Sequence, residues 1–397
     1  MDDAVIVSGA RTPIGTFGGA LGEVSAQQLG ATAIEEALKR GGVPPEEVDE
    51  VLMGNVISAG LGENPARQAA MAGKIPHTVP SMTVNKVCGS GLKTVALASQ
   101  AIRLGEAKVV VAGGMENMSR APYLLPKARY GYRMGHGELL DSMITDGLWC
   151  ALSDCHMGVT AENVAARWEI SRQEMDDFSY NSHMKATRAW ANGIFASEVV
   201  AVRIPQRRGD PKVVERDEHF RPDTALEQLA RLGPAFKRDG GAVTAGNSSG
   251  INDGGAAVVV TSAKEAQRRG LTPLGVIRGY ASVGVDPSIM GIGPVGAVRK
   301  VLATTGVKLE DIDLIELNEA FAAQSLAVIK ELDLDVQRLN VNGGAVALGH
   351  PIGCSGTRIL VTLLYEMQRR RAKLGLASLC IGGGMGIAMV VENPNAS

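Results

Sequence analysis

Apolar and polar positions follow one arrangement twice along the chain. Residues 33–55 align with residues 297–319 at a constant offset of 264, and each copy has apolar residues at helical spacing, a glycine, an acidic turn and an apolar run. The matched positions include Ala33 with Ala297, Leu38 with Leu302, Gly42 with Gly306, Val43 with Val307, Glu46 with Glu310, and Asp49 with Asp313. The pattern predicts, in each copy, a helix that ends at a glycine C-cap and is followed by a buried strand.

A second repeat follows each of these units. The segment GSGLKTVALASQAI, residues 89–102, resembles CSGTRILVTLLYEM, residues 354–367, with Ser90 opposite Ser355 and Gly91 opposite Gly356. Helices that alternate with apolar strands indicate an α/β fold, so we expect two duplicated, βαβ-rich halves with mainly parallel sheets covered by helices. The turns that carry Cys88 and Cys354 would then be equivalent.

The middle of the chain has a different composition, with more charged, proline and aromatic residues. We therefore expect an N-terminal half made of residues 1–118 and 244–268, an inserted loop domain over residues 119–243, and a C-terminal half over residues 269–397. Within the insertion, residues 160–190 predict one solid helical stretch. We expect the insertion to cover the site and to contact substrate or partner subunits.

Composition narrows the functional classes. The 397 residues are 45% hydrophobic and 21% charged, with a formal net charge of −2 and scattered basic residues, which argues against a broad nucleic-acid-binding surface. No targeting peptide and no apolar stretch long enough to span a membrane is visible, so we expect a cytoplasmic protein. The five cysteines, at positions 88, 150, 155, 354 and 380, are far apart and odd in number, which is typical of reduced thiols and not of a disulfide framework or a zinc site.

Cys88 is the first candidate for chemistry. It precedes Gly89, Ser90 and Gly91, which predict a turn into a largely buried helix. Free N–H groups and the positive end of the helix dipole stabilise a thiolate at such a position, which would lower the pKa of the thiol and make it nucleophilic. The alternative is a small buried hydrophobe, which is how most free cysteines behave.

Three further residues lie at predicted strand or loop ends. Asn318 ends a strand and could be a helix cap, His350 lies between Gly349 and Pro351 and could be a surface loop residue, and Cys380 could fill the core before a run of glycines. Taken together they fit a site, because open α/β sheets place chemistry at such junctions. Duplication would bring Cys88 of one half opposite these three residues of the other, and the neighbouring glycines would expose N–H groups for an oxyanion hole.

The chain resembles the thiolase family over its whole length. The resemblance rests on VIVSGARTPIG, NKVCGSGLK, NEAFA, NVNGGAVALGHPIGCSGTR and CIGGGMGIA, in that order. It implies a layered αβαβα core and is greatest to the acetoacetyl-CoA thiolases, or acetyl-CoA acetyltransferases, because HMG at residues 156–158 precedes TAENVA. The implied ligands are acetyl-CoA, acetoacetyl-CoA and CoA, with CoA as substrate or product and no separate cofactor or metal.

The resemblance also implies roles for individual residues. Cys88 would be the acetylated nucleophile with His350 as its base, Cys380 the second acid/base, and Asn318 the residue that orders a water at the enolate oxygen. The N–H groups of Cys88 and Gly382 would form an oxyanion hole. The residues implied in CoA binding are Leu148, His156, Met157 and Phe321 along the pantetheine tunnel, Ser249 on the pantetheine, and Arg221 at the nucleotide end.

Oligomerisation is a further expectation. The duplication, the apolar VVVAGG segment at residues 109–114 and the resemblance suggest that the N-terminal half pairs with its copy in a second chain. The region around residues 123–133 would then join two dimers into a homotetramer.

Other functions stay open at this point. The alternatives are a 3-ketoacyl-CoA thiolase of broader chain length in fatty-acid β-oxidation, and a non-catalytic acyl-CoA-binding module, which would need neither Cys88 nor Cys380. Decarboxylating ketosynthases share the fold but commonly need two histidines, and here only His350 lies in a matching motif. A nucleotide-binding oxidoreductase is a further class, but this sequence has no G-x-G-x-x-G motif after a first strand, which that class uses to bind a dinucleotide. Cys155, where an aromatic residue is expected, and the Trp149–Cys150 loop leave the acyl-pocket shape undetermined.

Overall fold

A ten-stranded sheet runs through the molecule. The computed structural model describes residues 2–396, and the strands follow the order β14-β15-β16-β13-β1-β12-β5-β3-β4, with the short β2 paired to β12. Their bounds are β1 Ala4–Arg11, β2 Gly15–Thr16, β3 Glu50–Gly54, β4 Ser81–Val84, β5 Val109–Asn117, β12 Asn252–Ser262, β13 Gly275–Gly284, β14 Leu314–Leu317, β15 Leu374–Ile381 and β16 Met385–Glu392. The halves of the sheet join where β1 pairs with β13 through Val5–Val276 and Ile6–Gly275.

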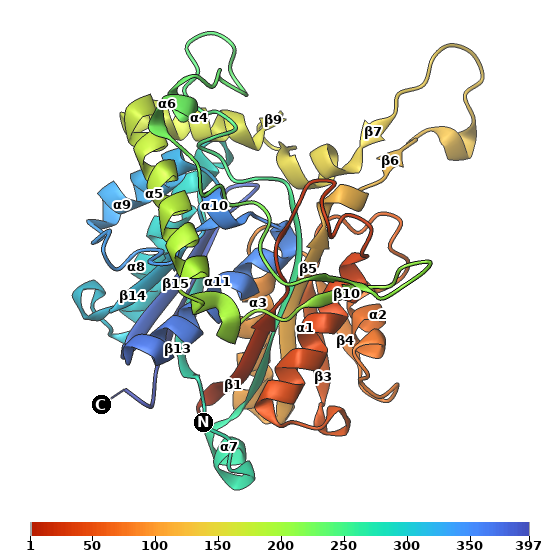
Figure 1. Ribbon diagram of the computed structural model, residues 1–397, viewed down its shortest axis with the longest axis vertical. Coiled ribbons are helices and arrows are strands. Elements are labelled where there is room, and N and C mark those ends of the chain that lie inside the picture. Colours follow the sequence, from red (N-terminus) through yellow and green to blue (C-terminus); the bar gives the residue numbers. More distant parts are fainter. Residues whose placement is uncertain (1, 397) are drawn as a thin grey trace.

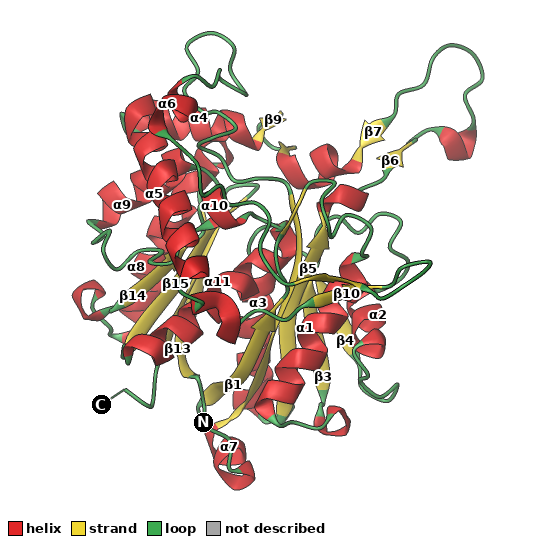
Figure 2. Cartoon of the chain, in the orientation of Figure 1, coloured by secondary structure: helices red, strands yellow, loops and turns green. Residues whose placement is uncertain are grey.

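Helices form three layers around the two halves of the sheet (Figures 1 and 2). Helices α3 (Ser90–Leu104) and α11 (Ile352–Arg370) pack against each other between the halves. Helices α1 (Ala26–Gly41) and α2 (Pro65–Ala72) cover the outer face of the first half, and α8 (Gly293–Thr305) covers the outer face of the second. The expected αβαβα layering is confirmed.

The expectation of mainly parallel sheets is wrong. The parallel pairs described in the main sheet are β3–β4, β3–β5 and β14–β15. The other main-sheet pairs are antiparallel, including β1–β12, β12–β5, β13–β16 and β15–β16. Each helical crossover ends in a parallel strand as predicted, but β16 returns from β15 through a tight glycine turn and therefore runs antiparallel.

The repeated sequence units form matching local structures. Asp49 and Asp313 precede β3 and β14, and each carboxylate accepts two backbone N–H bonds from the start of the neighbouring strand. The donors are Lys108 and Val109 to Asp49, at 2.7 and 2.9 Å, and Lys373 and Leu374 to Asp313, at 2.7 and 2.9 Å. The repeat in sequence is therefore a repeat in hydrogen bonding.

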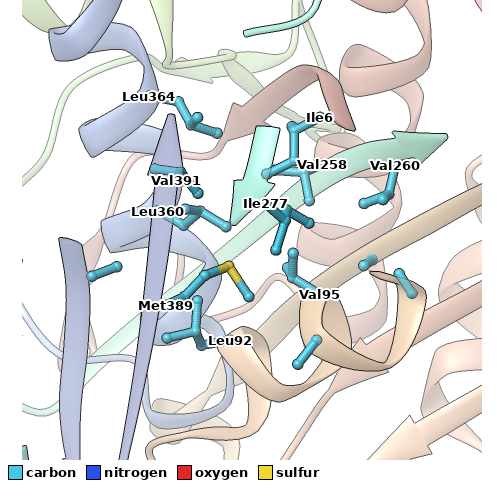
Figure 3. Packing of buried hydrophobic residues seen from close by; sticks show 14 of the residues in the cluster. Ile6, Leu92, Val95, Val258, Val260, Ile277, Leu360, Leu364, Met389 and Val391 are labelled. Atoms are coloured by element: carbon cyan, nitrogen blue, oxygen red, sulfur yellow. The ribbon is translucent and has the colours of Figure 1, made fainter. Parts of the chain in front are cut away.

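The two central helices approach closely at their first turns. A Cβ at Gly91 would lie 2.7 Å from the backbone nitrogen of Thr357, and a Cβ at Gly356 would lie 2.3 Å from that of Leu92. Only glycine permits this near-symmetric contact. Leu92, Val95, Leu360 and Leu364 then meet residues of both sheet halves, such as Val258 and Met389, in one buried cluster (Figure 3).

Residues 119–243 add no strand to the ten-stranded sheet. They form three small strand pairs, β6 (Tyr123–Leu124) with β7 (Leu140–Asp141), β8 (Trp149–Cys150) with β9 (Cys155–His156), and β10 (Val202–Ile204) with β11 (Lys212–Val214). The β6–β7 loop extends away from the other elements (Figure 1). Within the described residues, no helix is long and apolar enough to cross a membrane.

The prediction of a single helix over residues 160–190 is wrong, because two helices with a short non-helical segment between them occupy this stretch. Helix α4 spans Met157–Arg167 and α5 spans Arg172–Ala191. Ser171 begins α5 by accepting the Glu174 N–H, while the Glu174 side chain accepts the Ser171 N–H, a capping box that starts a new helix. The remaining helices are α6 (Leu226–Ala230), α7 (Ala263–Arg269), α9 (Ala322–Leu332) and α10 (Ala345–Leu348).

Candidate active site

Cys88 lies in a strained turn between β4 and α3. The preceding residue, Val87, has φ 47°, a left-handed conformation that is unfavourable for a β-branched side chain. Ser90 holds this turn, because its Oγ donates to the Val87 carbonyl at 2.6 Å and accepts the Lys86 N–H at 2.8 Å. Gly89 caps α3, so Cys88 lies immediately before the helix, as predicted. Backbone strain of this kind is concentrated at functional sites.

His350 contacts Cys88 from the other half of the molecule. Its Nε2 lies 3.3 Å from the Cys88 Sγ, and its Nδ1 lies 2.6 Å from the Ser355 Oγ. The Ser355 hydroxyl also lies 2.9 Å from the Pro351 carbonyl, to which it can donate. Ser355 then accepts the Nδ1 proton, which leaves a lone pair on Nε2 directed at the thiol.

The backbone around His350 is fixed by Asn252. The Asn252 Oδ1 accepts the His350 N–H at 2.9 Å, and its Nδ2 donates to the Gly15 carbonyl at 2.9 Å. Gly349 has φ 107°, and a Cβ there would lie 2.5 Å from the Asn252 side chain. The glycine in the sequence GHP therefore permits the contact that positions the imidazole.

Burial governs the protonation of this pair. It lowers the pKa of His350 to about 3, with the positive charge of the buried Arg358 as a second cause. It raises the pKa of Cys88 to about 11, against the opposite effect of N–H bonds from Gly382 and from Cys88 itself. The expected lowering of the Cys88 pKa by the helix start is therefore wrong, because desolvation outweighs the N–H groups. At neutral pH the site holds a thiol beside a neutral imidazole.

Asn318 and Cys380 lie behind this pair and are fully buried. The Asn318 Nδ2 is 3.5 Å from each His350 ring nitrogen, and its Oδ1 meets no hydrogen-bond donor among residues 2–396. Burial raises the pKa of Cys380, and a negative charge on Cys88 raises it further. All four polar residues expected from the sequence therefore converge on one place.

A small cavity opens onto Cys88. Its volume is about 50 Å³, so it admits only a small group. Seven of the expected site residues line it, namely Cys88, Leu148, Met157, Ser249, Phe321, His350 and Gly382. The other lining residues are Val87, Gly147, Met290, Ala320 and Ile352. Leu148 ends a π-helical turn, Met143–Leu148, and Met157 begins α4. Among these lining residues His350 is the only histidine.

Two of the expected CoA-binding residues lie outside this cavity. His156 stacks on Phe236, with ring centroids 4.7 Å apart, and its Nδ1 accepts the Gly158 N–H at 3.0 Å, so it caps α4. Arg221 lines a second cavity of about 210 Å³ together with His183 and His219. The segment from Ala245 to Ser249 borders both cavities.

Sequence reasoning missed the residues that hold His350. Ser355 appeared only as the repeat partner of Ser90, although that repeat was itself a signal that its hydroxyl holds a turn. Asn252 and Met290 gave no signal, because each is distant in sequence from the residues it contacts.

Comparison with known proteins identifies the family. Residues 4–264 match the family model "Thiolase, N-terminal domain", and residues 271–393 match "Thiolase, C-terminal domain". The chain is 56% identical to a protein of Cupriavidus necator named acetyl-CoA acetyltransferase, over 99% of this chain and 100% of that protein. It is also 56% identical to a probable acetyl-CoA acyltransferase of Staphylococcus aureus, over 99% of each. A crystal structure of the Bacillus anthracis acetyl-CoA acetyltransferase, 49% identical, superposes with a TM-score of 0.97 over 99% of each chain. The chain belongs to the thiolase family and has its fold.

Proposed function

We propose that this protein is an acetyl-CoA C-acetyltransferase, which condenses two molecules of acetyl-CoA to acetoacetyl-CoA and CoA and catalyses the reverse thiolysis. The observation that carries the proposal is the pairing of Cys88 with His350 at 3.3 Å, with the buried Cys380 close by. A nucleophilic thiol with a neutral base is what acyl transfer needs, and a second thiol suits proton transfer at carbon. The names of the relatives support the same activity.

The first half-reaction transfers an acetyl group to Cys88. His350 Nε2 takes the thiol proton as the sulfur attacks the thioester carbonyl, and the N–H groups of Cys88 and Gly382 stabilise the resulting oxyanion. Collapse breaks the carbon–sulfur bond to CoA. Cys380 gives its proton to the departing CoA sulfur, so the proton from Cys88 stays on His350 and Cys380 is left as a thiolate.

The second half-reaction forms the carbon–carbon bond. The Cys380 thiolate removes an α-proton from a second acetyl-CoA, while protonated His350 and a water held by the Asn318 Oδ1 stabilise the enolate oxygen. The enolate carbon attacks acetyl-Cys88, and the Cys88 sulfur leaves and recovers the proton from His350. Acetylation also keeps Cys88 uncharged, so no negative charge at that sulfur opposes formation of the Cys380 thiolate. The Asn318 Oδ1, which has no donor among the described residues, supports its role in binding water.

The CoA site extends outward from Cys88. Leu148, Met157 and Phe321 would line the pantetheine tunnel, with Ser249 hydrogen-bonded to the pantetheine. His156 would shape the wall through its cap on α4, and Arg221 would meet the nucleotide in the second cavity. The small volume beside Cys88 supports an acetyl group over longer acyl chains.

The proposal also covers the cofactor requirement, the location, the domain bounds and the oligomeric state of the protein. CoA serves as substrate and product with no separate cofactor, the site of action is the cytoplasm, and the chain is divided at residues 118/119, 243/244 and 268/269 as the sequence indicated. Residues 109–114 lie inside β5 between β3 and β12 and so cannot form an interface. The edge strand β4 is available for dimer formation, and the exposed Tyr130 and Met134 support contacts of the β6–β7 loop in a homotetramer.

Steady-state thiolysis tests the function. The enzyme should consume acetoacetyl-CoA only when free CoA is present, with a steep fall in kcat/KM as the 3-ketoacyl chain lengthens. Equal rates on long chains would replace the proposal with a broad-range thiolase, and absence of thiolysis would refute it.

The role of Cys380 has its own test. Cys380→Ser should still form an acetyl-enzyme with acetyl-CoA, visible by mass spectrometry, because CoA can depart as a thiolate without a proton from position 380. The variant should lose both condensation and thiolysis, because a serine hydroxyl near neutral pH does not supply the base that exchanges the α-proton. An acetylated variant that turns over at the wild-type rate would show that Cys380 is packing and that the second base lies elsewhere.

A further inference from the structure

Two cysteines that the proposed reaction does not use lie opposite each other in the β8–β9 hairpin. The pairs in this hairpin are Trp149 with His156 and Cys150 with Cys155. Trp149 Nε1 donates to the Asp154 Oδ1 at 3.1 Å across the turn, and Asp154 has φ 47°. The hairpin is therefore a tight turn closed by two cysteines.

The geometry of the pair suits a disulfide. Directly opposed residues in an antiparallel pair have Cα atoms about 4.5–5.5 Å apart and side chains on the same face of the sheet. Disulfides span Cα separations of about 4.4–6.8 Å. Cys150 is buried and Cys155 is half-buried, and both pack in the apolar cluster that contains Met157 and Phe321. Each cysteine is free in the structure.

We propose that Cys150 and Cys155 are a dithiol modification site that closes to an intramolecular disulfide when it meets a low-molecular-weight disulfide such as oxidised glutathione. The half-buried Cys155 attacks as a thiolate, which forms a mixed disulfide and releases one glutathione thiol. The buried Cys150 loses its proton to solvent and attacks the Cys155 sulfur, which releases the second glutathione thiol. Two cysteine thiols are thus oxidised while one disulfide is reduced to two thiols.

Burial sets the rate of this reaction. It raises the pKa of Cys155, and negative charge on Cys150 and Asp154 raises it further. Because the thiolate is the attacking species, closure should become faster as the pH rises. Reduction by excess glutathione should reopen the pair.

Closure needs only side-chain rotation within the hairpin, since the two cysteines occupy directly opposed backbone positions. The flanking Leu148 and Met157 line the cavity at Cys88, so the oxidised enzyme should keep that wall intact. On the basis of the proposed function, an enzyme whose Cys88 is protected as the acetyl thioester should retain its turnover after Cys150–Cys155 closure.

Peptide mapping tests the proposal directly. Trypsin releases residues 134–167 as one peptide that contains Cys150 and Cys155 and no other cysteine, while Cys88, Cys354 and Cys380 fall on separate peptides. After incubation in glutathione buffers of increasing oxidation, followed by acid quenching and alkylation, this peptide should lose both alkyl groups and the mass of two hydrogen atoms, reversibly. The matched Cys354 peptide should stay fully alkylated, because Cys354 has no cysteine opposite it.

Variants separate closure from simple modification. Cys150→Ser should accumulate glutathione on Cys155, because no second thiol resolves the mixed disulfide. A wild-type peptide that carries glutathione on Cys155, or that remains doubly alkylated in the most oxidising buffer, would overturn the proposal. So would loss of turnover in parallel with closure in the Cys88-acetylated enzyme. The peptide masses do not depend on turnover, so they test closure of the pair even if the proposed function fails.

Discussion

The two helix starts at the centre of the molecule have nearly the same sequence and different chemistry. In the first, Cys88 precedes the cap of α3 and lines a cavity. In the second, Cys354 lies within the first turn of α11, is fully buried, and has its pKa raised by burial to about 12. When Ser90 is placed opposite Ser355, Cys88 corresponds to Gly353 and Cys354 to Gly89. A shift of one residue therefore separates a reactive thiol from a packed one.

The backbone explains why the two turns differ. Helix α11 starts at Ile352, which corresponds to Val87, whereas at the first turn Val87 has a left-handed φ and α3 starts three residues later. The extra non-helical residues bring the Cys88 sulfur to the cavity surface. The serines also diverge, because Ser90 holds its own turn and Ser355 contacts the histidine that contacts Cys88. The two turns thus supply the nucleophile and its base.

The largest effect is expected on the rate of acetylation when Cys88, but not Cys354, is replaced. Cys88→Ser should lower the rate of acetylation by about 10³-fold or more, because a hydroxyl is a much weaker acid and nucleophile than a thiol. Cys354→Ser should lower the free energy of unfolding by roughly 1–3 kcal/mol through its buried hydroxyl and leave acetylation intact. Mass spectrometry after mixing with acetyl-CoA measures acetylation. Iodoacetamide should label Cys88 first, with protection by acetyl-CoA, and first labelling of Cys150 or Cys155 with loss of activity would break the comparison.

A smaller effect is expected at the asparagines that follow β3 and β14. Asn318→Ala should slow turnover by about 10²-fold while leaving the fold intact, by analogy with the loss of an oxyanion-stabilising group. The matched Asn55→Ala removes hydrogen bonds to Glu116 and the Met115 carbonyl, so it should reduce the free energy of unfolding by roughly 1–3 kcal/mol and retain turnover. Normal kinetics in Asn318→Ala would mean that this residue only holds structure.

The fold was largely predictable because local patterns and their repetition carry it. The helix, glycine cap and strand at residues 33–55 and 297–319 follow from apolar spacing, and the two similar halves follow from the duplication, whereas the αβαβα layering was implied by the resemblance to the thiolase family. Strand direction was not predictable, since it depends on how β12, β13 and β16 return across the sheet. The break between α4 and α5 was predictable in principle from Ser171 and Glu174.

The residues of the site were predictable from the sequence, but their pKa values and protonation states were not. Cys88, Asn318, His350 and Cys380 each follow from motifs at junctions, and the structure brings them together. The pKa of Cys88 was predicted in the wrong direction, because a sequence reveals the helix start but not how much protein surrounds the sulfur. Asn252 was missed for the same reason, since its contact with His350 joins residues far apart in the chain.

The serines offer a third contrast of intermediate size. Ser355→Ala removes the partner of the His350 Nδ1 proton, so a larger share of the imidazole should carry its proton on Nε2, facing Cys88. We expect kcat to fall by about 10-fold with KM nearly unchanged, and iodoacetamide labelling of Cys88 to slow in step. Ser90→Ala should chiefly destabilise the Val87 turn, measured as a lower free energy of unfolding. Unchanged labelling in Ser355→Ala would show that the serine does not set the tautomer.

The smallest effect concerns acid stability and distinguishes the α11 turn, which carries a buried histidine, from the α3 turn. The folded-state pKa of His350 is about 3, below the value near 6.5 of an unfolded histidine. Because the folded-state pKa is the lower one, the contribution of His350 to the free energy of unfolding is fully present above about pH 6.5. This contribution is lost as the pH falls toward about 3, because the unfolded chain binds the proton first. One such histidine contributes a slope of roughly 1 kcal/mol per pH unit between these limits. Chemical denaturation at several pH values and fixed protein concentration measures how the free energy of unfolding changes with pH. Its slope should be smaller by this amount in His350→Asn than in the wild type. The exposed His77 provides the matched control, and an equal reduction in His77→Asn would show that burial at the α11 turn is not the cause.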